Sequence, residues 1–140
     1  MSKEESFDIA KAIHECNFFS EAGEDVARAI SAISRVIRQP RGTTVFNDGD
    51  ACRGMFLVRT GAVKIFKTGA DGREHVLHVV MPGDCFGEAA MFLGTGYPAD
   101  AQAVKDSTLI LVRKEQFLGL LSREPDLSLR MMAAMAFPGG

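Results

Sequence analysis

The spacing of hydrophobic residues predicts helices over the first 38 residues of the chain. Two runs of hydrophobic residues at intervals of three and four lie on either side of residues 17–20, which break the pattern. The members of the two runs are Phe7, Ile9, Ala10, Ile13, Cys16 and Phe18, followed by Val26, Ala29, Ile30, Ile33 and Ile37. Pro40 comes just after the second run, and proline ends a helix because it has no backbone N–H. We therefore expect two helices within residues 1–38.

Residues 41–113 show instead short β-rich runs that are separated by glycine turns. Val63 and Ile65 alternate with Lys64, which is the period of a strand with one buried face. The glycine-rich residues 69–72 follow and predict a hairpin turn. Strands are predicted over residues 43–46, 55–59, 62–68, 74–80, 101–104 and 108–112. Many short strands at close intervals indicate a sandwich or barrel.

Helical spacing returns over residues 114–136. One short helix is predicted at 115–121, and Pro125 suits the first turn of the next helix. Hydrophobic residues recur along that second helix: Leu127, Leu129, Met131, Met132 and Met135. The order of helices, many strands and helices predicts one domain over residues 1–140, mainly β with flanking helices, in which a β-roll spans residues 41–113.

Composition narrows the function classes. Hydrophobic residues make up 46% of the chain, which is enough for a core, and 16 basic against 18 acidic side chains leave a net charge of −2. No basic run stands out, so no nucleic-acid surface is expected. No apolar run approaches the roughly 20 residues that span a bilayer, so no membrane partner is expected. Cys16, Cys52 and Cys85 are too scattered for a disulfide framework or a zinc site, and free thiols fit a reducing cytoplasm.

One segment carries candidate binding chemistry, where Gly87 follows a turn and precedes a short helical pattern. Glycine lets the backbone come close to a ligand. The amides of Glu88, Ala89 and Ala90 would be the unpaired donors at the start of a helix, and such donors favour an anion, above all a phosphate. The Glu88 carboxylate could accept a hydrogen bond from a sugar hydroxyl. The same residues also fit a turn and a capped helix that bind no ligand.

Turn and strand motifs follow one another along the chain in a recognisable order. They are Asn47-Asp48-Gly49-Asp50, Val58-Arg59-Thr60-Gly61-Ala62-Val63-Lys64, Gly72, Pro82-Gly83-Asp84, Phe86-Gly87-Glu88, Lys114-Glu115-Gln116-Phe117 and Glu124-Pro125-Asp126-Leu127. This order resembles the cyclic-nucleotide-binding domain family, and within it the bacterial Crp/Fnr regulators, over roughly residues 14–136. The resemblance implies a cupin-type β-roll, a double-stranded β-helix or jelly roll, that senses an effector.

The resemblance also implies a phosphate-binding cassette from residue 86 to about residue 104. In family members that bind cyclic AMP, a glycine–glutamate pair opens the cassette, and the glutamate takes the ribose hydroxyl. Gly87 and Glu88 stand at those places.

The arginine that clamps the cyclic phosphate in those members has no counterpart here. Its place falls on or beside Pro98, ahead of Ala99. A proline offers no donor, and Asp100 nearby would repel a phosphate. Loss of a buried charge-assisted pair costs about 2–5 kcal/mol, so the expected effector is not ordinary cyclic AMP. A cyclic nucleotide in an altered phosphate site stays open as an alternative.

The Tyr-Pro-Ala pattern at 97–99 resembles the Fnr-like and dissimilative-nitrate-respiration regulators more closely. The iron–sulfur form of these regulators needs several cysteines near the N-terminus, where only Cys16 lies. Haem, for sensing nitric oxide or redox state, is therefore an alternative cofactor. Its first candidate ligand is His78, on a strand face with Val76 and Val80 that in the family can look into the effector pocket. Weaker candidates are His14, His75, Cys85, Met131, Met132 and Met135.

The sequence therefore predicts the effector-sensing module of a bacterial transcription regulator. Its partners would be a small-molecule effector and, in the full-length context, a second copy in a homodimer. DNA would be contacted only through a helix-turn-helix domain that residues 1–140 do not contain. No enzyme is predicted, because no nucleophile–base pair or paired carboxylates stand in a motif. The predicted pocket comprises Gly87, Glu88, Ala89, Ala90, Pro98, Ala99, Asp100, His78 and Val80.

Overall fold

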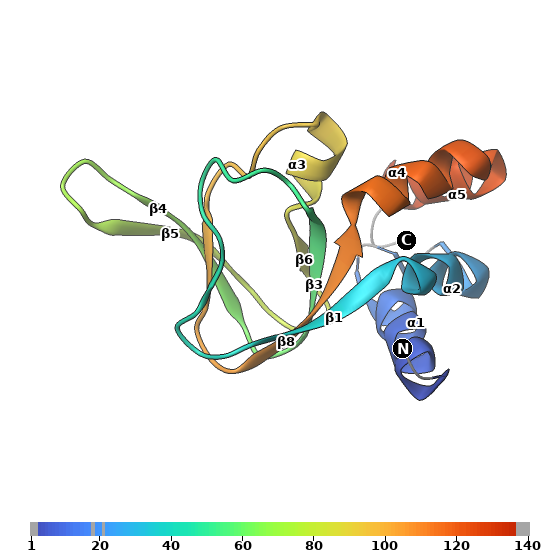
Figure 1. Cartoon of the computed structure of the whole chain (residues 1–140), viewed down its shortest axis with the longest axis horizontal. Coiled ribbons are helices and arrows are strands. Elements are labelled where there is room, and N and C mark those ends of the chain that lie inside the picture. Colours follow the sequence, from blue (N-terminus) through green and yellow to red (C-terminus); the bar gives the residue numbers. More distant parts are fainter. Residues whose placement is uncertain (1–2, 18, 21, 137–140) are drawn as a thin grey trace.

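A computed structural model describes residues 3–17, 19–20 and 22–136, with the side chains of 3–7, 127, 131–132 and 134–136 left undescribed. In the described part of the chain, helices precede and follow eight strands and one short helix in sequence, and the helices of both chain ends gather on one side of the strands (Figure 1). In chain order the elements are α1 Lys3–Glu15, α2 Glu24–Ala32, β1 Ser34–Gln39, β2 Thr44–Phe46, β3 Gly54–Thr60, β4 Val63–Thr68, β5 Glu74–Val80, β6 Cys85–Phe86, α3 Glu88–Leu93, β7 Asp100–Ala103, β8 Ser107–Arg113, α4 Lys114–Arg123 and α5 Pro125–Ala136.

The strands form two four-stranded antiparallel sheets that enclose the interior of a β-roll. Their strand orders are β1-β8-β3-β6 in the first sheet and β2-β7-β4-β5 in the second. Apart from β4 and β5, which form a hairpin, neighbours in each sheet are distant in sequence, as in a jelly roll, and this hairpin projects away from the helices (Figure 1). The predicted fold class, a mainly β roll with flanking helices, is confirmed.

The prediction of helix through residue 38 is wrong. Helix α2 ends at Ala32, and residues 34–39 form β1, which pairs antiparallel with β8. Val36 packs against the helix-side core and Ile37 against the interior of the roll, so successive side chains point to opposite faces. Ile33 and Ile37 are four residues apart, an interval that fits a helix. The same interval also arises when Ile33 ends a helix and Ile37 lies in the strand that follows.

Aromatic rings fill the interior of the roll. Phe46 stacks on Tyr97 with ring centroids 3.7 Å apart and planes at 5°, and Phe56 stacks on Phe86 at 5.1 Å. Phe46 also contacts Phe56 and Phe86, each at 5.9 Å. The four rings come from β2, β3, β6 and the loop before β7, so their packing ties both sheets together.

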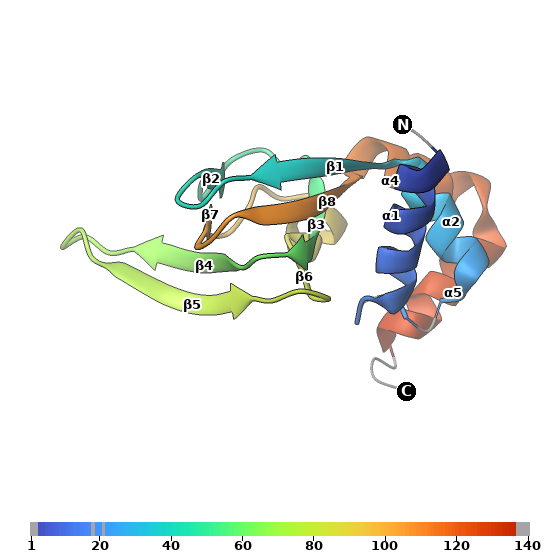
Figure 2. The same cartoon turned by 90° about the horizontal axis from the view of Figure 1, so that it is seen from below.

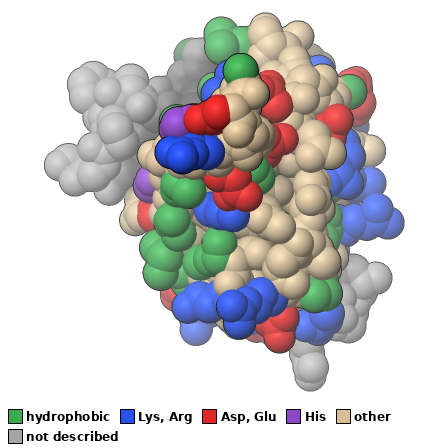
Figure 3. All heavy atoms as spheres, turned by 90° about the vertical axis from the view of Figure 1, so that its left-hand side faces the viewer, with side chains coloured by type: hydrophobic (Ala, Val, Ile, Leu, Met, Phe, Trp, Pro, Cys, Tyr) green, Lys and Arg blue, Asp and Glu red, His purple; other side chains and the backbone are tan. Residues whose placement is uncertain are grey.

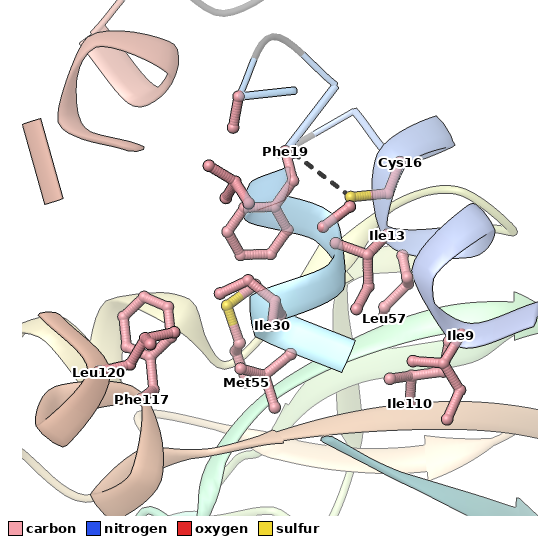
Figure 4. Close-up of a cluster of buried hydrophobic side chains, with 14 of the residues drawn as sticks. Ile9, Ile13, Cys16, Phe19, Ile30, Met55, Leu57, Ile110, Phe117 and Leu120 are labelled. Carbon is pink, nitrogen blue, oxygen red and sulfur yellow. Dashed lines mark hydrogen bonds between the residues drawn. The ribbon is translucent and has the colours of Figure 1, made fainter. Parts of the chain in front are cut away.

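A second core lies between the helices and the outer face of the first sheet (Figure 4). Ile9 and Ile13 of α1, Ile30 of α2 and Phe117 of α4 are fully buried there against Ile110 of β8. The two faces of β8 thus serve different cores, as the period of two along a strand requires. Among the described residues, no helix is long and apolar enough to cross a membrane.

The β4–β5 hairpin leaves hydrophobic side chains exposed. Val76, Leu77 and Val79 are 54%, 61% and 41% exposed. Seen from the hairpin end, hydrophobic side chains gather on one side of the molecule, above a band of Lys and Arg (Figure 3). The ladder between β4 and β5 shifts register between Ile65 and Phe66, which marks a β-bulge in this hairpin.

An ion pair fastens helix α5 to the start of α2. The Arg130 guanidinium donates to both carboxylate oxygens of Asp25 and, at 2.9 Å, to the carbonyl of Ala22. These hydrogen bonds from Arg130 hold the pKa of Asp25 well below its usual value. Gly23, at φ +97°, lies so close that a Cβ there would be 2.9 Å from the guanidinium. The left-handed backbone conformation at this turn favours a glycine.

We predict that Arg130→Gln loosens α5 without unfolding the roll. The substitution removes the charge-assisted bonds to Asp25, so amide hydrogen exchange should quicken in α5 and at the start of α2 but not in β3 and β8. Arg28→Gln, an exposed arginine of α2, is the matched control and should change nothing.

The same ion pair predicts a pH dependence. Because the folded pKa of Asp25 is lowered, its contribution is present above the ordinary carboxyl pKa and is lost as the pH falls through the lowered folded value. Exchange in α5 should therefore rise under strongly acid conditions in the unsubstituted chain. If amide exchange in α5 is equal in Arg130→Gln and Arg28→Gln at neutral pH, the role assigned to Arg130 is wrong.

Candidate functional site

The cassette predicted from the sequence begins at a glycine that no other residue could replace without strain. Gly87 has φ +83° in the left-handed region and stands between β6 and α3. A Cβ added there would lie 3.2 Å from the Tyr97 ring and 3.4 Å from the Gly54 carbonyl oxygen. Segments that are far apart in sequence thus meet beside the backbone of Gly87.

Tyr97 anchors the far end of this segment. Its side chain is 1% exposed, and its hydroxyl donates to the Gly54 carbonyl at 2.7 Å. The hydroxyl oxygen of Tyr97 also accepts hydrogen bonds from the backbone N–H groups of Arg53, at 3.1 Å, and of Gly54, at 3.3 Å. Burial raises the pKa of Tyr97 to about 12, so the hydroxyl stays a donor at neutral pH. The sequence reasoning used this residue only as part of a pattern and missed its anchoring role.

Glu88 supplies the least satisfied polar group of the cassette. Its side chain is half-buried at the start of α3, and Oε2 is buried without a hydrogen-bond partner among the described residues. A buried acceptor without a donor costs free energy. The carboxylate therefore favours any ligand that brings an O–H or N–H group to this position.

The place predicted for the missing arginine holds no charge. Pro98 is exposed, and the adjacent Ala99 is 3% exposed. Asp100 is engaged elsewhere, since its Oδ1 accepts the backbone N–H of Asp48 at 2.8 Å. Asp100 therefore fixes the turn at residues 47–50, a structural role that the sequence reasoning did not assign.

The remaining predicted residues of the cassette differ in their surroundings. Ala89 is exposed, whereas Ala90 is 1% exposed and packs with the interior aromatic rings. Val80 is fully buried in the same interior cluster. The structure thus brings Val80, Ala90 and Tyr97 together, with Gly87 against the Tyr97 ring.

His78 lies apart from this cluster, on the exposed hairpin. It is exposed and stands opposite Ile65 in the β4–β5 ladder. The bulge places Val76 opposite Phe66, so the prediction that His78 shares a face with Val76 is wrong. A bulge adds one residue to a strand and so reverses the alternation of faces beyond it.

The other candidate ligands are scattered. Cys85 contacts Cys16, and this hydrogen bond together with burial raises the pKa of the Cys85 thiol, which keeps it protonated. His14 is half-buried in α1, with Nδ1 buried and unpartnered among the described residues. His75 is exposed on β5. The side chains of Met131, Met132 and Met135 lie outside the described part, as does residue 18.

The comparison with known families decides the identity. The family described as "Cyclic nucleotide-binding domain" matches residues 36–124, which include the cassette and both sheets apart from the first two residues of β1. The chain belongs to the cyclic nucleotide-binding domain family. Within that family, its relatives include Crp/Fnr regulators, as the order of its motifs predicted.

Three relatives illustrate the similarity. The cyclic AMP receptor protein of Thermus thermophilus is 33% identical over 119 residues, covering 85% of this chain and 55% of that protein. The fumarate nitrate reduction regulatory protein of Klebsiella oxytoca is 30% identical over 97 residues, covering 69% of this chain and 38% of that protein. The sensor domain of the regulator DNR from Pseudomonas aeruginosa superposes with a TM-score of 0.78 at 25% identity, covering 94% and 88% of the two chains.

The shares of the relatives that are covered show which part of those proteins the chain matches. It spans about half the length of the first curated relatives it matches, but nearly the whole of the isolated DNR sensor domain. The similarity therefore concerns the sensor domain of Crp/Fnr-type regulators.

We predict that Gly87→Ala destabilises the domain more than Gly72→Ala does. Both glycines have positive φ, near +80°, which costs an alanine about 1–2 kcal/mol. A Cβ at position 72 meets nothing within 4 Å, whereas one at position 87 presses on the Tyr97 ring. Urea denaturation of the two variants measures the difference, and equal losses would show that the cassette has room beside Gly87.

Proposed function

We propose that this domain senses a small effector through the cassette at residues 86–104 and that ordinary cyclic AMP is not that effector. Two features of the cassette, one at Glu88 and one at Pro98, carry the proposal together. Glu88 keeps a buried carboxylate oxygen that lacks a donor, while Pro98 offers neither a charge nor an N–H where a phosphate clamp would stand. The site thus suits a ligand with a hydroxyl or amine group better than one that depends on a cyclic phosphate.

We further propose that the domain acts as one part of a longer transcription regulator. Its named relatives are regulators, which supports a regulatory and non-enzymatic role in the cytoplasm. In a full-length protein the domain would pair with a second copy and act on DNA through a helix-turn-helix domain. Effector binding would change activity only if the effector binds the active and inactive arrangements with different affinity.

Haem binding is not part of the proposal. The first candidate ligand, His78, is exposed on a projecting strand, and Cys85 is held as a thiol by Cys16 and by burial. Haem therefore stays a prediction of the sequence, to be tested by the spectrum of the protein after addition of haemin.

Calorimetric titration with cyclic AMP and cyclic GMP tests the proposal. The unsubstituted chain should give no binding heat at micromolar nucleotide. Pro98→Arg should raise the affinity for cyclic AMP at least about 30-fold, since a charge-assisted phosphate pair is restored. Ala70→Arg, which adds the same charge at an exposed position between β4 and β5, is the control and should raise nothing.

The role of Glu88 is tested in the same experiment. The gain from Pro98→Arg should be lost when Glu88→Gln is added, because glutamine cannot offer a charged acceptor to the ribose hydroxyl. Micromolar binding of cyclic AMP by the unsubstituted chain would refute the proposal. A gain that survives Glu88→Gln would refute the part assigned to Glu88.

A further inference from the structure

We propose that a second site, separate from the cassette, binds a small phosphate-bearing molecule in a groove between helix α1 and the outer face of the first sheet. We name it the α1 groove and define it by Asp8, Arg38, Arg59, Thr60 and Thr108, which line a cavity of about 490 Å³ together with Val36. Figure 2 shows α1 beside the first sheet, near the beginning of β1.

Three of the groove residues form one row across neighbouring strands. Arg38 of β1 pairs with Thr108 of β8, and Thr108 pairs on its other side with Thr60 of β3. Residues that stand opposite each other in a ladder point to the same face of the sheet. This face is the helix side, because Ile110, two residues along β8, lies in the helix-side core.

A β-bulge adds the second guanidinium to this row. Between Val58 and Thr60 the ladder of β3 with β8 shifts register: Val58 stands opposite Leu109 and Thr60 opposite Thr108, so Arg59 is the extra residue. In a regular strand, residues 59 and 60 would point to opposite faces. Bulges redirect side chains in this way and occur often beside functional sites. Here Arg59 and Thr60 line the same cavity.

The groove continues along α1. A neighbouring cavity of about 470 Å³ shares Asp8, Arg59 and Thr60 with the first and is lined further along by Lys11 and Glu15. Two adjoining cavities of this size leave room for a metabolite beyond its phosphate group. The cassette glycine and glutamate line neither cavity, so the site is distinct from the one in the proposed function.

The charges of the groove favour an oxyanion. Arg59 has only a loose ion pair, 3.6 Å from Asp8, and both side chains are well exposed to solvent, at 38% and 51%. Arg38 makes no ion pair among the described residues. Two guanidinium groups and two threonine hydroxyls on one face supply the donors that a tetrahedral phosphate accepts. Asp8 then acts as the carboxylate that the phosphate displaces from Arg59.

Titration of the isotopically labelled chain with inorganic phosphate, followed by NMR, tests the site. Phosphate should shift the amide signals of Arg38, Thr60 and Thr108, and Arg38→Gln should weaken binding about tenfold or more. Arg35→Gln is the matched control, since Arg35 is exposed on the same strand but points to the other face. All titrations are compared with sodium chloride at equal ionic strength, which removes general screening.

Asp8→Asn gives the sharpest test. Removal of the competing carboxylate should tighten phosphate binding about threefold. This change in affinity corresponds to the Coulomb energy of one charge several ångström away in water. Succinate should bind more weakly than phosphate. The proposal is overturned if phosphate shifts no groove signal beyond the chloride control, if Arg35→Gln and Arg38→Gln have equal effects, if Asp8→Asn does not tighten binding, or if succinate binds better. None of these outcomes bears on nucleotide binding at the cassette, so the two proposals fail independently.

Discussion

The geometry of the cassette depends on the buried hydroxyl of Tyr97. This hydroxyl bonds to the carbonyl and the N–H of Gly54 and to the N–H of Arg53, all at the entry to β3. The ring beside it stacks on Phe46 and lies against Gly87. One side chain therefore joins the loop before β7, the start of β3 and the turn into α3. The uncharged Tyr97 side chain thus fixes the region in which relatives that bind cyclic AMP are expected to hold a guanidinium.

Contacts run from this region to the helices. The backbone N–H of Asn17 donates to the carbonyl of Gly83 at 3.0 Å, and its side-chain amide bonds to Asp84. The end of α1 is thus tied to the turn that leads into the cassette. Pro82 and Gly83 of that turn also line the cavity next to the α1 groove. The turn before the cassette therefore borders the cavity next to the α1 groove, although coupling between the two sites requires that each ligand prefer one arrangement of that turn.

Much of the fold could be predicted because its signals are local. The alternation over residues 62–68 and the glycine turn after it placed β4 and β5 to within one residue, and Pro125 marked the start of α5. The strand β1 was missed because Ile33 and Ile37 share the four-residue interval of a helix. Its strand character arises from pairing with β8, some 70 residues away in sequence.

The sites were harder to predict than the elements, for the same reason. Glu88 and Gly87 were found through a motif, but the anchoring of Tyr97 on Gly54 joins residues 43 positions apart. The orientation of His78 and of Arg59 depends on bulges, which exist only once two strands have paired. No pattern within a single strand contains that information.

Equilibrium unfolding of Tyr97→Phe measures how far the cassette depends on the Tyr97 hydroxyl. Phenylalanine keeps the stacked ring and removes only the hydroxyl, leaving the Gly54 carbonyl and two N–H groups without their partner. We expect a loss of about 1–3 kcal/mol in the free energy of unfolding, together with altered amide signals at Gly54 and Gly87. A variant with unchanged stability and unchanged signals in the cassette would contradict this dependence.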